Sequence, residues 1–357
     1  MITSYLRKTI RDFVPYTVAP IHESHVVNAN ENYLNVLSIP GVRRDVEEAL
    51  ASFTPQIYPA PMADGLRGVL AEYMGVSPEN VLCGNGGDEL ITYVLNTFLD
   101  PGDKVLIHVP TFDMYELGAE TLGASILKVE DRPGYRRDIE AFLSVREKET
   151  PKLTFLCNPN NPTGELLSLE IVKAAAEACE APIVVDEAYM EFAKGESAVS
   201  LIQDHPNVIV LRTLSKAFGL AGMRCGYIVA AKETIDAVAK VKNPYNLNAW
   251  TQLFGAIAVK HREDILKTRD AIVAERERME KELAAIPGVT AYPSKTNFIL
   301  IQVKDREEEL FAAWKKADIL VKQYKGKALL PRAFRITVTS RAVNDALIRV
   351  MKEVYHA

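Results

Sequence analysis

Four segments of the chain carry residues whose types and spacing could do chemistry, and the first is built around a lysine. Lys216 follows an apolar run at 207–211 and has the hydroxyls of Thr213 and Ser215 and the guanidinium of Arg224 close to it in sequence. A lysine serves as an amine nucleophile where a sheltered site lowers its pKa, and hydroxyls with a guanidinium suit a phosphate group. The segment fits such a site, or else a polar loop with a solvated lysine.

The second segment places an acid at the end of an apolar run. Asp186 follows Pro182-Ile183-Val184-Val185. A carboxylate in that place is costly unless a partner satisfies it, and a bound cation or a protonated ring nitrogen would do so. The alternative is an aspartate that caps a helix.

The remaining two segments are rich in turn-forming residues. The stretch 158–164 holds two Asn-Pro steps and a glycine, which fix a rigid turn around Asn161. The stretch 84–89, with Gly87 and Asp88, opens a helix, where free backbone N–H groups can hold a phosphate, although no Walker pattern follows. Each alone also fits a plain loop. Together the four segments supply phosphate-binding elements, a buried acid, a reactive amine and a fixed asparagine, which suits a pyridoxal phosphate site.

Alternating strands and helices must position these residues. Apolar runs predict strands over 104–109, 153–157, 182–186, 207–211 and 225–230, and 3.6-residue periodicity predicts helices over 66–74, 87–98 and 168–179. Wholly apolar strands that alternate with helices indicate an α/β fold with a buried, mostly parallel sheet and helices on both of its faces. Ligands bind at the carboxyl ends of such strands, where the chemical segments lie.

The texture of the sequence changes near residue 250. The later pattern predicts a long charged helix over 262–283, a strand over 297–303, a second helix over 307–317 and a second strand over 334–339. The first 60 residues are rich in Pro and Asn and read as an arm and loops. We therefore expect an arm at 1–30 that packs on the small domain or a dimer partner, a large cofactor-binding domain at 31–250, and a small α+β domain at 251–357.

Composition excludes several classes of protein. Apolar residues make up 48% of the 357 residues and charged residues 25%, which is typical of a globular chain. The net charge of −5 gives no electrostatic footprint for nucleic acid, and no apolar run approaches the roughly 18 residues of a membrane span. The N-terminus lacks a hydrophobic signal core, and the four scattered cysteines form no metal spacing. We expect a cytoplasmic protein with reduced thiols and no metal.

The segments also carry a family resemblance. SKAFGLAGMR, NPNNPTG, VVDEAY and GNGGDEL resemble those of fold-type-I pyridoxal-phosphate aminotransferases, and more narrowly the histidinol-phosphate aminotransferase group of class II. Asn28–Asn32, Tyr58-Pro59, 110–115 and Arg335-Ile336-Thr337 extend the match from about residue 28 to the C-terminus. The resemblance implies a large domain with a mostly parallel sheet, a smaller α+β domain, and pyridoxal 5'-phosphate as the cofactor.

The resemblance also implies roles toward the cofactor. Lys216 would be the Schiff-base lysine, Asp186 would pair with the pyridine nitrogen, and Tyr115 would stack on the ring. Tyr189 and Asn161 would hydrogen-bond its phenolic oxygen. The cofactor phosphate would be held by side chains and by backbone N–H groups of Thr213, Ser215, Arg224, Gly87 and Asp88.

Further roles concern the substrate and a partner. Tyr58 resembles a tyrosine that reaches the phosphate from the neighbouring subunit, which implies a homodimer with shared active sites. Arg335 resembles the arginine that grips the substrate's acidic group, and Lys322 stands where a second arginine often lies. Tyr16 of the arm would cover the site, and Asn161 would also face the substrate.

The implied reaction moves an amino group between histidinol phosphate and 2-oxoglutarate, in histidine biosynthesis. Three alternatives stay open: an aminotransferase for aromatic or other amino acids, a threonine-phosphate decarboxylase of the same fold, and a non-enzymatic regulator that has kept the fold. Intact Lys216, Asp186, Arg224 and Arg335 argue against the last.

Overall fold

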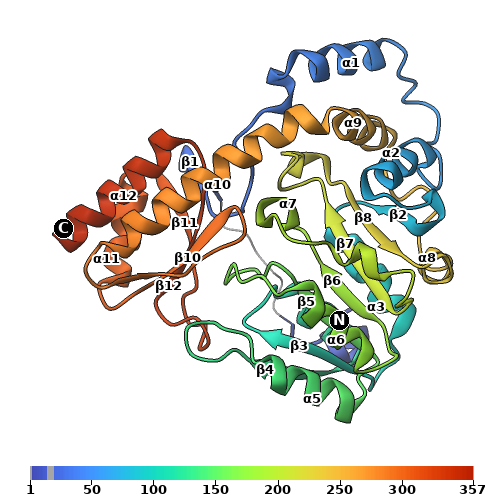
Figure 1. Cartoon of the computed structure of the whole chain (residues 1–357), viewed down its shortest axis with the longest axis horizontal. Helices are drawn as coiled ribbons and strands as arrows, with labels where there is room; N and C mark the ends of the chain where they lie inside the picture. Colours follow the sequence, from blue (N-terminus) through green and yellow to red (C-terminus); the bar gives the residue numbers. More distant parts are fainter. Residues whose placement is uncertain (1, 14–19, 357) are drawn as a thin grey trace.

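The larger of two sheets has seven strands and forms the core of the larger part of the molecule, to the right of the smaller sheet in Figure 1. The computed structural model describes residues 2–13 and 20–356. The strand order is β2 (Val81–Gly84), β8 (Gly226–Ala230), β7 (Val208–Thr213), β6 (Ile183–Asp186), β5 (Leu153–Cys157), β3 (Lys104–Val109) and β4 (Ser125–Glu130). Strands β4, β3, β5, β6 and β7 are parallel, and β8 runs antiparallel to both of its neighbours. The expectation of a mostly parallel sheet is confirmed.

The central strands are apolar throughout because both of their faces are covered. Val208 and Val210 of β7 pack in one core cluster, whereas Ile209 and Leu211 pack in the other. This alternation is the two-residue period of a strand buried on both sides. The helices that cover the faces and edges of this sheet are α2 (Asp64–Met74), α3 (Gly87–Phe98), α4 (Met114–Thr121), α5 (Ile139–Glu149), α6 (Leu169–Glu177), α7 (Met190–Ala193), α8 (Lys232–Ala239) and α9 (Ala249–Lys260).

The second sheet has five strands and draws one of them from the beginning of the chain. Its order is β1 (His25–Val27), β11 (Ile319–Gln323), β12 (Ala333–Thr337), β10 (Phe298–Val303) and β9 (Val289–Ala291). Strand β1 pairs parallel with β11, and the other pairs are antiparallel. Helices α10 (Arg262–Ala284), α11 (Glu307–Lys316) and α12 (Arg341–Tyr355) pack with this sheet, on the left in Figure 1.

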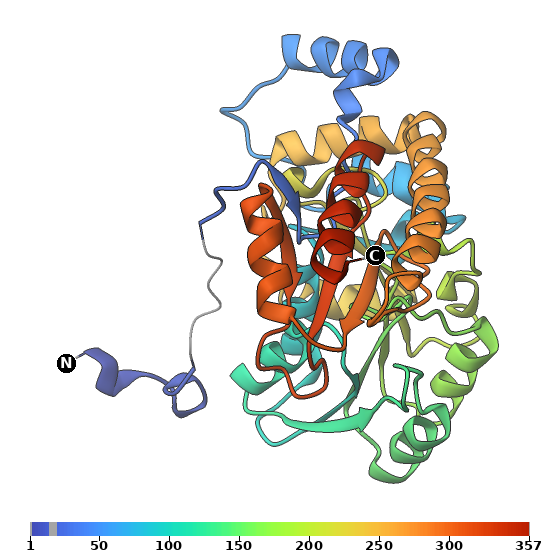
Figure 2. The ribbon, with the colours of Figure 1, turned by 90° about the vertical axis from the view of Figure 1, so that its left-hand side faces the viewer.

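One early helix was not expected. Residues Pro40–Ala51 form α1, so the interpretation of the first 60 residues as an arm and loops is wrong for this stretch. Only Val42 and Val46 of α1 are buried, and Figure 2 shows the helix at the outer edge of the molecule. The helix has few apolar residues and begins with Pro40-Gly41, a pair typical of turns, which is why the sequence did not predict it.

The beginning of the chain contacts both parts of the fold. The Thr9 hydroxyl donates to the Thr121 carbonyl at the end of α4, over 3.1 Å, and β1 joins the small sheet. The division into 1–30, 31–250 and 251–357 stays a prediction. No helix in the described part of the chain is long and apolar enough to cross a bilayer.

Candidate active site

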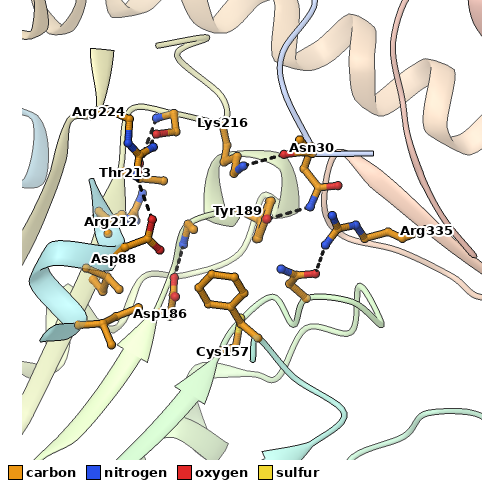
Figure 3. Close-up of a pocket in the computed structure, with 18 residues that line it drawn as sticks. Asn30, Asp88, Cys157, Asp186, Tyr189, Arg212, Thr213, Lys216, Arg224 and Arg335 are labelled. Carbon is orange, nitrogen blue, oxygen red and sulfur yellow. Dashed lines mark hydrogen bonds and ion pairs between the residues drawn. The ribbon is translucent and has the colours of Figure 1, made fainter. Parts of the chain in front are cut away.

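A cavity lies at the carboxyl ends of β5, β6 and β7, with Asn30 and Arg335 at one side of it (Figure 3). Ten predicted site residues line it: Gly87, Asp88, Asn161, Asp186, Tyr189, Thr213, Ser215, Lys216, Arg224 and Arg335. These residues lie on strands of both sheets, on the segments that follow the strands of the larger sheet, and at the start of α3. The fold thus gathers groups that are separated by up to about 250 residues in the sequence.

Lys216 provides a sheltered amine on the loop after β7. Its Nζ donates a hydrogen bond to the Ala29 carbonyl over 3.0 Å. Burial, and next the positive charge of Arg335, lowers the pKa of Lys216 to about 8. The amine therefore gains a large neutral fraction near pH 8, as a nucleophile or a proton acceptor requires.

Asp186 ends β6 and faces the cavity as a desolvated carboxyl group. One oxygen, Oδ2, accepts a hydrogen bond from the Tyr115 hydroxyl at 2.5 Å, and Oδ1 accepts from the Ala188 backbone N–H at 3.0 Å. Burial raises the pKa of Asp186 to about 6, against these two hydrogen bonds. A protonated ring nitrogen placed in the cavity would compensate the buried negative charge.

The predicted stacking role of Tyr115 is wrong. Its ring is fully buried and lies parallel to Phe155, with centroids 4.6 Å apart and planes 11° apart. Tyr115 is in the first turn of α4 and turns into the core, whereas Phe112 precedes that helix and lines the cavity. Phe112 is thus the aromatic side chain of this segment that lines the cavity, and the sequence analysis did not single it out. Its signal was its place just after β3, within the stretch 110–115 that carries the resemblance.

The phosphate-binding elements converge at the N-terminus of α3. Arg224 Nη2 lies 2.9 Å from Asp88 Oδ2, and the Thr213 hydroxyl is 3.0 Å from that of Ser215. Gly86 has a positive φ of 84°, and a Cβ there would clash with the Arg224 guanidinium. A side chain at this position would therefore fill the cradle between the loop and Arg224.

The donor set in this corner fits a phosphate. Free N–H groups of a helix N-terminus, two hydroxyls and a guanidinium all donate hydrogen bonds toward an anion. The residues present therefore fit pyridoxal phosphate: Arg224, Thr213 and Ser215 would hold its phosphate, and Asp186 would pair with its ring nitrogen. Lys216 and Tyr189 line the same cavity.

Arg335 brings a cation into the cavity from β12. Its Nη2 donates to the Asn28 carbonyl over 2.8 Å, and its Nη1 donates to Asn161 Oδ1 over 2.5 Å. The guanidinium carbon lies 5.3 Å from the centroid of the Phe298 ring. Its Nε is buried without a hydrogen-bond partner among the described residues. This arrangement suits recognition of a carboxylate or a phosphate.

Two further predicted residues, Lys322 and Tyr58, lie outside the cavity. Lys322 is the cross-strand neighbour of Arg335, and its ammonium lies 5.9 Å from the centroid of the Tyr324 ring, outside the group that lines the cavity. Tyr58 is 77% exposed and stacks on Tyr245 at 4.4 Å, so it does not reach the cavity of its own protomer. Tyr16 lies outside the described residues.

Asn30 is a second residue that the predicted site did not include. Its side-chain amide Nδ2 donates to the Tyr189 hydroxyl oxygen over 2.9 Å, and Asn30 lines the cavity. The sequence feature that could have indicated Asn30 is the segment 28–32, which forms part of the family resemblance but was given no role.

Comparisons with known proteins agree with this geometry. The family model "Aminotransferase class I and II" matches residues 24–351. The chain is 42% identical to the histidinol-phosphate aminotransferase of Thermoanaerobacter sp. strain X514, over 99% of each chain. Its fold matches a crystal structure of histidinol-phosphate aminotransferase from Sinorhizobium meliloti in complex with pyridoxal-5'-phosphate. That match has a TM-score of 0.89 and 26% identity over 99% of this chain and 98% of that one.

A decarboxylase shares the fold as well. The L-threonine-O-3-phosphate decarboxylase of Porphyromonas gingivalis matches with a TM-score of 0.82 and 23% identity, over 93% of this chain and 100% of that one. This likeness concerns the fold alone.

Proposed function

The chain belongs to the class I and II aminotransferase family, and we propose that it transfers an amino group from histidinol phosphate to 2-oxoglutarate, with pyridoxal 5'-phosphate as its cofactor. The products would be imidazole acetol phosphate and glutamate. The observation that carries the proposal is one cavity that holds the amine of Lys216, the carboxyl group of Asp186 and the cation of Arg335. The full-length similarity to histidinol-phosphate aminotransferases supports the choice of substrate.

Each side chain has a definite task in this proposal. When bound, the cofactor supplies an electron-withdrawing ring that stabilises negative charge at the reacting carbon. Asp186 keeps a proton on the ring nitrogen, which preserves that property. Lys216 Nζ would take the proton from the substrate carbon and deliver it to the cofactor carbon that receives the amino group, because its lowered pKa lets it act as base and then as acid near neutral pH.

Arg335 would bind the acidic group of either substrate. A guanidinium forms paired hydrogen bonds with a phosphate or a carboxylate, so one residue can receive histidinol phosphate in one half-reaction and 2-oxoglutarate in the other. Thr213, Ser215 and Arg224 would hold the phosphate of the cofactor, a non-reacting group whose binding orients the ring.

We further propose a homodimer in which Tyr58 reaches the cofactor phosphate of the partner subunit. Tyr58, Ile57 and Tyr245 are 77%, 62% and 49% exposed, and Tyr58 and Tyr245 stack on one another. Large apolar side chains that gather on a surface favour contact with another protein. A cytoplasmic location also stays a prediction.

The test is the visible spectrum of the purified, cofactor-loaded protein during addition of histidinol phosphate without a keto acid. The absorbance of the lysine-bound cofactor should fall in proportion to the donor added, and 2-oxoglutarate should restore it. Absorbance that resists histidinol phosphate and falls with phenylalanine would move the assignment to aromatic donors. Carbon dioxide released from threonine phosphate would move it to a decarboxylase.

A further inference from the structure

Asn30 links the small sheet to a side chain that faces the cavity from the large sheet. It is 1% exposed and has a left-handed backbone with φ of 57°. Its backbone N–H donates to the Thr337 hydroxyl oxygen over 3.0 Å, and its carbonyl accepts from Asn297 Nδ2 over 2.9 Å. Its side-chain Nδ2 donates to the Tyr189 hydroxyl oxygen over 2.9 Å (Figure 3). Both the backbone and the side chain of Asn30 are thus fixed by hydrogen bonds.

The orientation of the Asn30 side-chain amide follows from the hydrogen bond that the Thr337 hydroxyl donates. Thr337 is 1% exposed, and among the described residues its proton has one acceptor, Asn30 Oδ1, at 3.3 Å. The amide oxygen of Asn30 therefore faces Thr337, which leaves the amide nitrogen toward Tyr189. A hydroxyl that accepts from an amide must send its own proton elsewhere.

The hydroxyl proton of Tyr189 can point only into the cavity. The side chain is 4% exposed and lines the cavity beside Lys216, and none of the described residues accepts its proton. Burial raises the pKa of Tyr189 above its ordinary value, so the hydroxyl keeps its proton at neutral pH. Its proton is thus available to an acceptor inside the cavity.

We propose that Asn30 is a positioning residue that turns the Tyr189 hydroxyl proton into the cavity, where Tyr189 donates to an anionic oxygen of the bound cofactor. The inference rests on the proposed function, because the acceptor belongs to pyridoxal phosphate. It adds Asn30, which lines the same cavity, as a residue that works through Tyr189. Asn30 acts only through the direction of one hydrogen bond.

The test reverses that direction with Asn30→Asp. Aspartate tolerates a left-handed backbone and has nearly the same shape, but its carboxylate accepts the Tyr189 proton instead of donating to the phenol. Removal of a donor from an anionic oxygen favours its protonated form. The pKa at which the visible band of the lysine-bound cofactor changes should therefore rise by about one unit, a tenfold change in proton affinity. Asn30→Ala should give a smaller rise.

A double-mutant cycle separates this effect from simple charge. Tyr189→Phe should raise the same pKa, and Asn30→Asp should add less than about a third of its single effect in that background. The matched control is Asn35→Asp, which adds the same charge five residues away. Asn35 is exposed, and its side-chain oxygen accepts from the Leu37 N–H, a bond that a carboxylate keeps. This control should leave the pKa unchanged.

The outcomes distinguish the two proposals. A full Asn30→Asp shift in the Tyr189→Phe background would mean a direct effect of charge and would overturn the role of Asn30. A normal band with an unshifted pKa in Asn30→Asp would overturn it as well and leave the proposed function standing. A wild-type protein that forms no such band would overturn the proposed function and this inference together.

Discussion

Arg335 Nη1 donates a 2.5 Å hydrogen bond to Asn161 Oδ1, and this contact joins β12 of the small sheet to the loop after β5 of the large sheet. The bond occupies the amide oxygen of Asn161, so its nitrogen is the group left to donate elsewhere. The proposed substrate-binding cation and the asparagine expected to contact the cofactor are therefore parts of one hydrogen-bonded unit.

Replacement of Arg335 should weaken substrate binding. Arg335→Lys removes the planar fork and with it at least one charged hydrogen bond, worth about 1.5–3 kcal/mol, so kcat/KM should fall by roughly 10- to 150-fold, mainly through KM. Steady-state kinetics with both substrates checks this. Arg341→Lys, at an arginine side chain that is 64% exposed, should change neither constant. An unaltered KM in Arg335→Lys would exclude the binding role.

The lowered pKa of Lys216 predicts how the cofactor-free protein reacts with pyridoxal phosphate. Only the neutral amine attacks an aldehyde, so the rate of covalent capture should rise with pH and reach half its maximum at about pH 8. Stopped-flow absorbance measures that rate. Lys216→Ala should form no lysine-bound band and show no turnover, and survival of either would contradict the central assignment.

Tyr115 should set the pH below which cofactor affinity is lost, because its hydrogen bond affects the pKa of Asp186. Below about pH 6 the Asp186 carboxyl group is protonated and loses its attraction for a ring cation. Tyr115→Phe removes the hydrogen bond to the ionised form, so the pKa of Asp186 should rise, and the loss of affinity should begin about one pH unit higher. Cofactor titration across pH 5–8 measures it. Tyr227→Phe, at another fully buried tyrosine, should leave the limit in place.

The shared-site proposal predicts complementation between two defective variants. Lys216→Ala removes the amine, and Tyr58→Ala should weaken the hold on the cofactor phosphate. If Tyr58 serves the partner's site, a mixed dimer has one intact site, and mixing the two variants should restore up to half of wild-type activity per mixed dimer. Activity at limiting cofactor, with the mass in solution, checks this. No gain on mixing would show that Tyr58 does not act across subunits.

Arg212 should matter for stability. Its guanidinium lies 2.8 Å from Glu187 and 2.9 Å from Glu191, and all three side chains are at most 5% exposed. Arg212→Met leaves two buried carboxylates without their cation, so the free energy of unfolding should fall by about 3–5 kcal/mol. Urea unfolding followed by circular dichroism measures the change. Arg44→Met, at an arginine that is 68% exposed, should cost less than about 1 kcal/mol.

Local patterns were enough to predict the central strands and the polar segments at their ends. The apolar runs of β5, β6 and β7 are visible in sequence because both faces of these strands are buried. Parallel strands place their carboxyl ends at one edge, so Asn161, Asp186 and Lys216 could be expected to meet before any contact was known. The identity of the cofactor followed from those residue types together.

Only the tertiary structure decided which side chains face the cavity. Tyr115 and Phe112 are three residues apart at the start of α4, and the direction of the helix sends one into the core and leaves the other at the cavity. Side-chain direction of this kind depends on packing between distant segments, which local spacing does not encode. The same is true of Asn30, whose partners Tyr189 and Thr337 lie 159 and 307 residues away. The sequence by itself determined the chemistry of the site, and the packing of the two sheets determined its geometry.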